Sequence, residues 1–107
     1  MTRYTLHVPL QLNDGAPVDA DTLATIESDL LDLAGGFTAT EGIGAWRGNG
    51  GHVYREPVRL YHVDTAEPDA PELLAALASS VARWLDQEAV YLTAAPLATQ
   101  LLTAVPA

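Results

Sequence analysis

Apolar and polar residues alternate along the start of the chain in the pattern of a half-buried β-strand. Over residues 4–12 every second residue is apolar, and this period of two indicates a strand with one face in a core. Pro9 has no amide hydrogen, so pairing there is expected to be one-sided or bulged. Asn13-Asp14-Gly15 then predicts a turn. The apolar face contains Tyr4, Leu6, Val8, Leu10 and Leu12.

Two later segments repeat their apolar residues every three to four positions, which predicts amphipathic helices. The first is expected to begin at a cap formed by Asp19 or Asp21 and to end at Gly35-Gly36. The second begins with Asp69 as its cap and Pro71 in its first turn. The predicted buried stripes are Leu23, Ile26, Leu30 and Leu33 in the first helix, and Leu74, Leu77, Val81, Trp84 and Leu85 in the second. Glu27, Asp29 and Asp32 are expected to form a solvated face.

Three further strands are predicted at 37–47, 52–64 and 89–95, the last closed by Pro96. The resulting β-α-β-β-α-β order predicts an α+β fold: a ferredoxin-like plait with a four-stranded antiparallel sheet and both helices on one face. The first and third strands are then central, and the other sheet face is open. Residues 1–107 are expected to form one domain, with a plait core at 1–96 and an apolar tail at 97–107. The tail is expected to add an edge strand or a short helix.

The middle two strands are expected to form a hairpin around Asn49-Gly50, a strong signal for a two-residue turn. This register pairs Arg47 with His52 and Phe37 with His62, and it places Phe37, Ala39, Val58 and Leu60 on the core face. A slip of one residue would move one strand's side chains to the opposite face. Pro57 cannot donate to a ladder, so the hairpin beyond it is expected to project past the central sheet.

In this register the open face combines a glycine floor with aromatic and basic side chains. Gly42 and Gly44 carry no side chains, and larger groups surround them, which is the composition of a ligand pocket or partner surface. The predicted ligand-binding residues are Gly42, Gly44, Trp46, Arg55, Arg59, Tyr61 and Tyr91. The alternative interpretation is structural: the glycines permit strong strand twist, and Trp46 covers the end of the hairpin.

His7 is the best candidate for an acid or base, because it falls on the open face and imidazole titrates near neutrality. The predicted register places it close to Tyr61 and Arg59, which completes the set of catalytic candidates. His62 is predicted to be hydrogen-bonded on the core face, and His52 to be exposed. Glu56 is predicted on the helix side, paired with Arg47 or accepting from backbone amides.

Recognised catalytic and metal-binding motifs are absent from the sequence, which contains no nucleophile elbow, zinc-protease helix, phosphate loop or EF-hand spacing. The glycines at 48, 50 and 51 join two strands rather than a strand to a helix, so they lack the helix dipole of a phosphate loop. We therefore expect no metal and no cofactor, and the sequence identifies no reaction.

The amino-acid composition limits the classes of partner that the protein is expected to bind. The chain has 107 residues, 49% of them hydrophobic, and no cysteine, which fits a globular protein without disulfides. Fourteen acidic residues against five basic ones give a formal net charge of −9, which disfavours nucleic acid and anionic membranes. No apolar run is long enough for a membrane span and no signal peptide is apparent, so the expected location is the cytoplasm.

A group of residues spread along the chain resembles a family of small bacterial domains of unknown function. The resemblance rests on Gly42-x-Gly44-x-Trp46-Arg47, Gly51 and Glu56-Pro57, with Asp14-Gly15…Val18 before them and Gln87-Glu88-Ala-Val90 after them. It implies the same order of helices and strands over nearly the whole chain. It implies no activity.

Three functional hypotheses follow. The leading one is a non-catalytic module that dimerises, or binds a small molecule or a protein, through the open face and the hairpin at 42–57. The alternative is a cofactor-independent isomerase, cyclase or monooxygenase of the dimeric plait-barrel type, with His7, Arg59 and Tyr61 lining a cavity. The third is an acidic mimic that binds a basic protein, and it rests only on the net charge.

Overall fold

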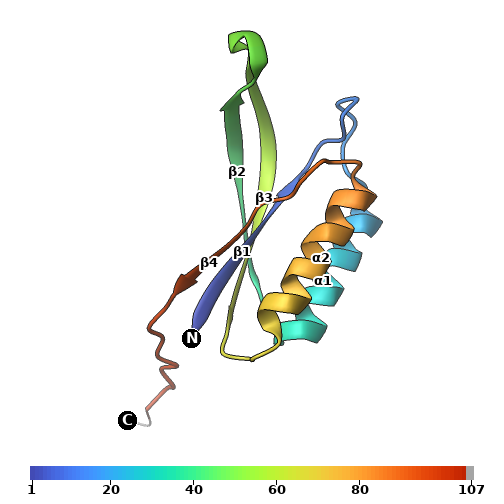
Figure 1. The fold of residues 1–107 in the computed structure, drawn as a ribbon. Helices are drawn as coiled ribbons and strands as arrows, with labels where there is room; N and C mark the ends of the chain where they lie inside the picture. The colour runs from blue at the N-terminus through green and yellow to red at the C-terminus, as the bar shows by residue number, and fades with distance from the viewer. Residues whose placement is uncertain (106–107) are drawn as a thin grey trace.

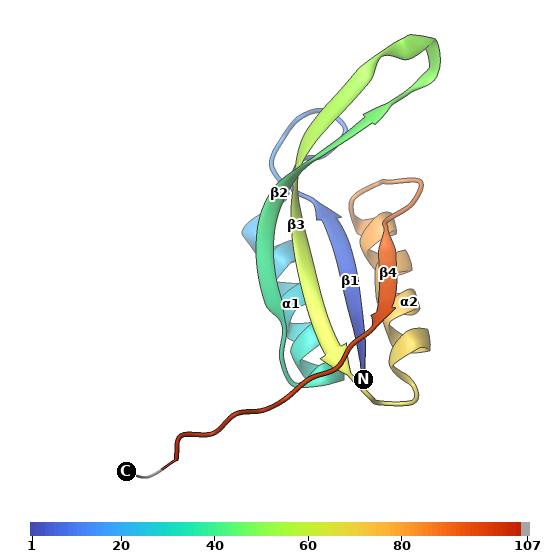
Figure 2. The ribbon, with the colours of Figure 1, turned by 90° about the vertical axis from the view of Figure 1, so that its left-hand side faces the viewer.

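The computed structural model describes residues 1–105 and shows one antiparallel sheet with both helices packed on the same face (Figures 1 and 2). The strand order is β2-β3-β1-β4, so the first and third strands are central, and the predicted ferredoxin-like α+β fold is confirmed. The elements are β1 (Thr2–Pro9), α1 (Ala20–Ala34), β2 (Thr38–Arg47), β3 (Val53–Thr65), α2 (Ala70–Trp84) and β4 (Leu92–Pro96).

The core lies between the sheet and the helices and is built from the apolar faces that the sequence pattern predicts. Its largest fully buried side chains come from the sheet and from both helices: Leu6, Val8, Ile26, Leu30, Tyr61, Val63, Leu74 and Val81, each at most 1% exposed. Trp84 was expected in this core, but it is 46% exposed. Adjacent helical residues point about 100° apart, and Leu85 continues the buried stripe of α2 instead, at 2% exposure.

Helix α1 begins and ends where the capping residues predict. The carboxylate of Asp19 accepts a hydrogen bond from the amide of Thr22 at 2.7 Å, which satisfies a free donor of the first turn. Gly35 then ends the helix in the left-handed conformation and donates its amide to the Leu31 carbonyl at 2.8 Å. These caps set the two ends of α1.

The turn of the β2–β3 hairpin contains three residues, Asn49–Gly51, and not the two that we predicted. Gly48 donates its amide to the His52 carbonyl at 2.8 Å and closes the loop. Gly50 and Gly51 adopt φ angles of 78° and 83°, which glycine accepts without a steric penalty. Each residue of β2 therefore pairs one position further along β3 than predicted, with Arg47 opposite Val53 and Ala39 opposite Tyr61.

This shift reverses the two faces of β3, because side chains alternate along a strand. Arg55, Arg59 and Tyr61 were expected on the open face, but they lie on the side that carries the helices. The residues between them, Glu56, Val58, Leu60 and His62, take the open face instead. The faces predicted for β1 and β2 are correct. The observed register keeps Tyr61 and Val63 in the core, where they are 0% and 1% exposed, whereas the predicted register would have turned both side chains out of it.

The distal half of the hairpin projects beyond the rest of the sheet, as Pro57 indicates (Figures 1 and 2). Strand β1 ends its pairing with β3 at Pro9 and Val58. Beyond one hydrogen bond from the Leu10 amide to the Pro57 carbonyl at 3.0 Å, the remaining part of β3 pairs with β2 alone. The long axis of the molecule, 59 Å against 26 and 24 Å, reflects this hairpin and the extended C-terminal segment.

Residues 97–105 lead away from β4 without helix or strand, so the expected edge strand or short helix is wrong for this part; residues 106 and 107 lie outside the described residues. The amide of Leu97 still donates to the Met1 carbonyl at 3.0 Å. Beyond it, Leu101 and Leu102 are 93% and 82% exposed. No helix within residues 1–105 is long and apolar enough to cross a membrane.

Replacing a core leucine is expected to be far more costly than replacing one in this tail. Leu30→Ala removes a fully buried side chain and should lower the free energy of unfolding by about 2–5 kcal/mol. Leu101→Ala should change it by less than about 0.5 kcal/mol, because that side chain is exposed. Urea denaturation of both variants measures the difference, and equal losses would show that the tail packs on the body.

Candidate functional site

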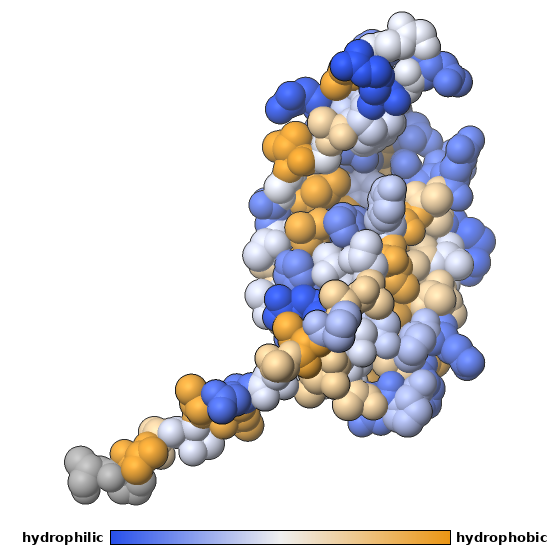
Figure 3. Space-filling view, turned by 60° about the vertical axis from the view of Figure 1, so that its left-hand side comes forward, coloured by the Kyte–Doolittle hydropathy of each residue, from blue (hydrophilic) through white to orange (hydrophobic). Residues whose placement is uncertain are grey.

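An open groove of about 930 Å³ lies on the sheet face that the helices leave uncovered. It sits where the base of the β2–β3 hairpin faces the segment that leads into β4 (Figure 2). Apolar side chains gather on this side of the molecule below the hairpin tip (Figure 3). The lining residues are His7, Pro9, Gly44, Ala45, Trp46, Glu56, Val58, Gln87, Ala89, Val90, Tyr91, Leu92 and Thr93.

Gly44 leaves space for the groove. A Cβ atom built on it would lie 3.5 Å from the Val58 side chain, which is an ordinary van der Waals contact. A larger side chain at this position would therefore fit the strand and fill part of the groove. Gly42 lies two residues away on the same face, but it does not line the groove, and a Cβ atom there would meet open space.

Three aromatic rings from the two hairpin strands and their turn pack together at the outer end of the groove. Trp46 and Tyr54 stack with their ring centroids 5.6 Å apart, and Tyr54 meets His52 edge-on at 4.5 Å. The Tyr54 ring lies so close to Gly48 that a Cβ atom there would approach it to 2.6 Å. The indole of Trp46 is thus fixed by its neighbours, although it stays 49% exposed.

The opposite wall of the groove is held by the loop that follows β1. The Asn13 side chain donates to the Asp86 carbonyl at 2.8 Å and accepts from the Gln87 amide group at 2.9 Å. The backbone of His7 donates to the Tyr91 carbonyl at 3.0 Å, which extends the pairing of β1 with the segment before β4. These bonds hold residues 86–91 in place beside the sheet.

Burial shifts the pKa values of two side chains that line the groove, Glu56 and His7, in the direction that favours their neutral forms. The pKa of Glu56 is raised by partial removal from water. The pKa of His7 is lowered from 6.5, first by burial and then by repulsion from His62. Both causes favour the neutral imidazole of His7, and its ring lies 5.8 Å from that of Tyr91. Within residues 1–105, no arginine lines the groove.

His62 lies on the open face and not in the core, again because of the register of β3. Its Nδ1 atom is 3.0 Å from the Thr5 hydroxyl, and its Nε2 atom is 3.5 Å from the Thr40 hydroxyl. The hydrogen bonding predicted for His62 is therefore present, on the opposite side of the sheet. His52 is exposed, as predicted.

The predicted catalytic set of His7, Arg59 and Tyr61 is not assembled, because the sheet separates its members. On the helix side, the Tyr61 hydroxyl donates to the Glu27 carboxylate at 2.7 Å. Arg59 lies between two carboxylates, 3.4 Å from that of Glu27 and 2.6 Å from that of Glu41. Glu27 was expected to be solvated, but it anchors this cluster. Burial raises the pKa of Tyr61 to about 12.

The structure therefore brings together part of the predicted site and replaces the rest. Gly44, Trp46 and Tyr91 line the groove together with His7. Gly42 shares the face but lies outside the groove, and Arg55 is exposed on the opposite face of the hairpin. Glu56 and Gln87 line the groove although sequence reasoning gave neither a ligand-binding role. The sequence does carry a signal for Glu56. If Tyr61 is assigned to the core, then Arg59 and Pro57 share its face, and Glu56 must lie on the opposite, open face.

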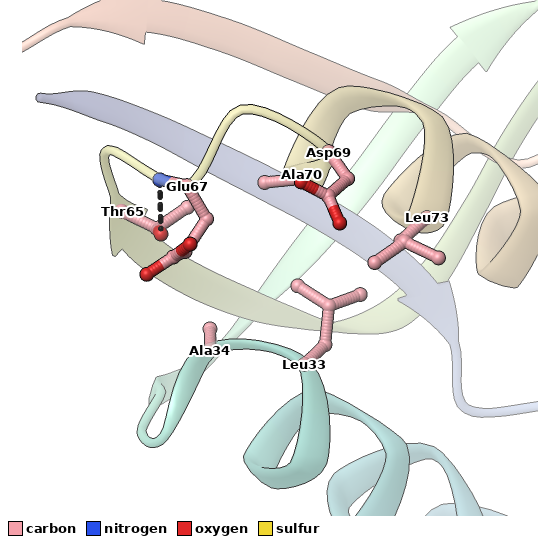
Figure 4. Close-up of a pocket in the computed structure, with 7 residues that line it drawn as sticks. All are labelled: Leu33, Ala34, Thr65, Glu67, Asp69, Ala70 and Leu73. Carbon is pink, nitrogen blue, oxygen red and sulfur yellow. Dashed lines mark hydrogen bonds between the residues drawn. The ribbon is translucent and has the colours of Figure 1, made fainter.

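A second, smaller cavity of about 180 Å³ lies between the end of α1 and the start of α2 (Figure 4). Leu33, Ala34 and Leu73 line it together with the loop that joins β3 to α2. In that loop the Thr65 hydroxyl accepts from the Glu67 amide at 3.1 Å. Within residues 1–105, no group of three or more histidine, aspartate or glutamate side chains could hold a metal ion.

Comparison with solved structures shows the fold and leaves the activity open. A phage SAM lyase in complex with S-methyl-5′-thioadenosine is 13% identical with a TM-score of 0.67, and the match covers 88% of this chain and 79% of that one. The periplasmic divalent cation tolerance protein CutA from Archaeoglobus fulgidus is 15% identical with a TM-score of 0.63, over 94% and 88% of the chains. A DUF3240 family protein from Shewanella baltica is 15% identical with a TM-score of 0.56, over 96% and 97%. No protein-family model and no curated protein sequence matches the chain.

The hydroxyl of Tyr61 is expected to stabilise the fold. Tyr61→Phe removes the donor to Glu27 and should lower the free energy of unfolding by about 1–3 kcal/mol, since the lost bond involves a carboxylate. Tyr54→Phe is the matched control, because Tyr54 lies at the exposed hairpin tip. Urea denaturation compares the two. If Tyr61→Phe leaves the free energy of unfolding unchanged, the bond from Tyr61 to Glu27 does not stabilise the fold.

His7 is expected to make the protein less stable as the pH falls. Its pKa is lower in the folded state than the ordinary value of 6.5, so the unfolded chain binds more protons below that pH. The free energy of unfolding should therefore fall relative to that of His7→Asn as the pH drops from neutrality through 6.5. Chemical denaturation of both proteins at a series of pH values measures this difference. A difference that grows in favour of the wild type at low pH would contradict the assignment.

Proposed function

We propose that this chain is a single-domain, non-catalytic binding module that forms a homo-oligomer through its projecting hairpin and binds a small ligand in the groove at the hairpin base. The observation that carries the proposal is the hairpin itself. Four of its large apolar side chains are 45–63% exposed: Ile43, Trp46, Val53 and Tyr54. A two-stranded hairpin without a covered face is marginally stable in water.

The exposed apolar side chains lie on both faces of the hairpin. Ile43 and Val53 share the side that carries the helices nearer the body, while Trp46 and Tyr54 share the open side. Each face of the hairpin therefore carries exposed apolar side chains that a partner would cover. A second copy of the chain is the partner that we favour, since each copy contributes the same uncovered hairpin. A dimer is the simplest closed arrangement.

The groove supports the ligand-binding part of the proposal. Its volume of about 930 Å³ lies within the range of small-molecule sites, and it combines apolar walls with a few polar groups. Among proteins of the same fold, one holds S-methyl-5′-thioadenosine and others are named for divalent cation tolerance. These likenesses support only the view that this fold can carry ligand sites. The proposed contacts are Gly44, Trp46, Glu56, His7 and Tyr91.

Polar substitutions on the hairpin are expected to weaken self-association without unfolding the protein. In the double variant Ile43→Thr/Val53→Thr, both side chains keep a branched Cβ atom and suit a strand. Sedimentation equilibrium should show an oligomer for the wild type. For the variant, the dissociation constant of the oligomer should be about tenfold higher. The control is Leu31→Thr/Leu73→Thr, whose parent side chains are each 49% exposed on the helices.

The control variant should associate like the wild type. A wild-type chain that sediments as a monomer at every concentration tested would contradict the proposed oligomer. So would equal effects of the hairpin and the helix variants. Circular dichroism of each variant checks that the fold is retained.

A further inference from the structure

The charged and aromatic groups of the groove point to a particular class of ligand. We propose that the groove binds an organic cation, with the Glu56 carboxylate as its counter-ion and the rings of Trp46 and Tyr91 against its apolar groups. This assignment rests on the ligand-binding part of the proposed function. It does not depend on self-association.

Charge complementarity favours a cation. Among the residues that the structure describes, Glu56 is the only aspartate, glutamate, lysine or arginine that lines the groove. The arginines near it in the sequence are directed elsewhere: Arg55 lies on the opposite face of the hairpin, and Arg59 binds Glu41 and Glu27 on the helix side. Arg47 donates to the Gly51 carbonyl at the turn. The formal net charge of −9 adds a field that attracts cations and repels anions.

The aromatic side chains suit the same ligand. Tyr91 and Trp46 are 76% and 49% exposed and line the same groove. The face of an aromatic ring attracts a cation, and indole does so most strongly. The Trp46 ring is fixed by stacking on Tyr54, so little freedom of this side chain is lost when a ligand binds.

Partial desolvation of Glu56 strengthens its attraction for a bound cation. A carboxylate that has lost part of its water interacts more strongly with an opposite charge than one in bulk water. The raised pKa of Glu56 reports that loss. No arginine or lysine lines the groove to pair with this carboxylate, so a cationic ligand would supply the missing partner.

Three small probes with a common ring and different charges test the assignment: phenyltrimethylammonium, benzyl alcohol and benzenesulfonate. Isothermal titration calorimetry with the full chain should show the cation binding at least about tenfold more tightly than the neutral alcohol, with no binding of the sulfonate. In the variant Trp84→Phe, Trp46 is the single remaining tryptophan. Its fluorescence should respond to the cation with the same midpoint.

Two matched pairs of variants locate the site. Glu56→Gln should weaken binding of phenyltrimethylammonium about tenfold, whereas Glu72→Gln makes the same change in net charge at an exposed position on α2 and should have no effect. Gly44→Val should weaken binding of phenyltrimethylammonium at least about tenfold, because the added side chain occupies part of the groove, whereas Gly42→Val adds the same side chain on the same strand in open space and should leave binding unchanged.

The outcomes separate the two proposals. If all three probes bind with equal affinity and Gly44→Val weakens that binding, the proposed preference for a cation is wrong, and the groove is still a ligand site. Equal effects of Glu56→Gln and Glu72→Gln would show general electrostatic attraction and would overturn the assigned counter-ion. An absence of binding by every probe would contradict the cation site, while the sedimentation experiment still decides the proposed oligomer.

Discussion

The arrangement of both faces of the sheet depends on the burial of Tyr61 and Val63. These two side chains pack under the helices at 0% and 1% exposure. Because β3 has no bulge in its pairing with β2, they determine the direction of every other side chain on the strand. Arg59 must then lie beneath α1, where Glu27 and Glu41 neutralise it, and Glu56 must lie on the open face. A structural requirement of the core thus places the only carboxylate in the groove.

The three-residue turn produces the same register that the burial of Tyr61 and Val63 requires. Gly50 and Gly51 supply two residues at positive φ, and Gly48 lets the Tyr54 ring lie against the backbone. The glycines that mark the hairpin in the sequence therefore serve different purposes. Those of the turn set the register, Gly44 leaves the groove open, and Gly42 faces open space. The structural interpretation therefore applies to the glycines of the turn, while Gly44 lines the groove that we propose as a site.

The fold was predictable because its signals are local and repeated. Alternation on β1, the stripe of Ile26 and Leu30, the Asp19 cap and the Gly35 end all agree with one another and with the structure. The face of β3 was not, because Val53–Thr65 carries apolar residues at both alternating sets of positions. Tertiary packing against Leu6 and Glu27 selects between them, in agreement with the length of the turn. Of the residues that line the groove, His7, Gly44, Trp46 and Tyr91 are among the predicted site residues, whereas Glu56 and Gln87 are not. The proximity of Gln87 to the sheet arises from contacts with Asn13 that are distant in sequence.

The register of the hairpin is the claim on which the groove, the cluster under α1 and the proposed cation site all depend. Nuclear Overhauser contacts between α-protons test it directly, since in antiparallel sheets they join directly opposed residues at every second pair. We expect such contacts within one alternate set, Gly44 with Glu56 and Gly42 with Val58, or Ala45 with Arg55 and Ile43 with Pro57. Contacts of Gly44 with Arg55, or of Ala45 with Tyr54, would show a two-residue turn and would contradict the account.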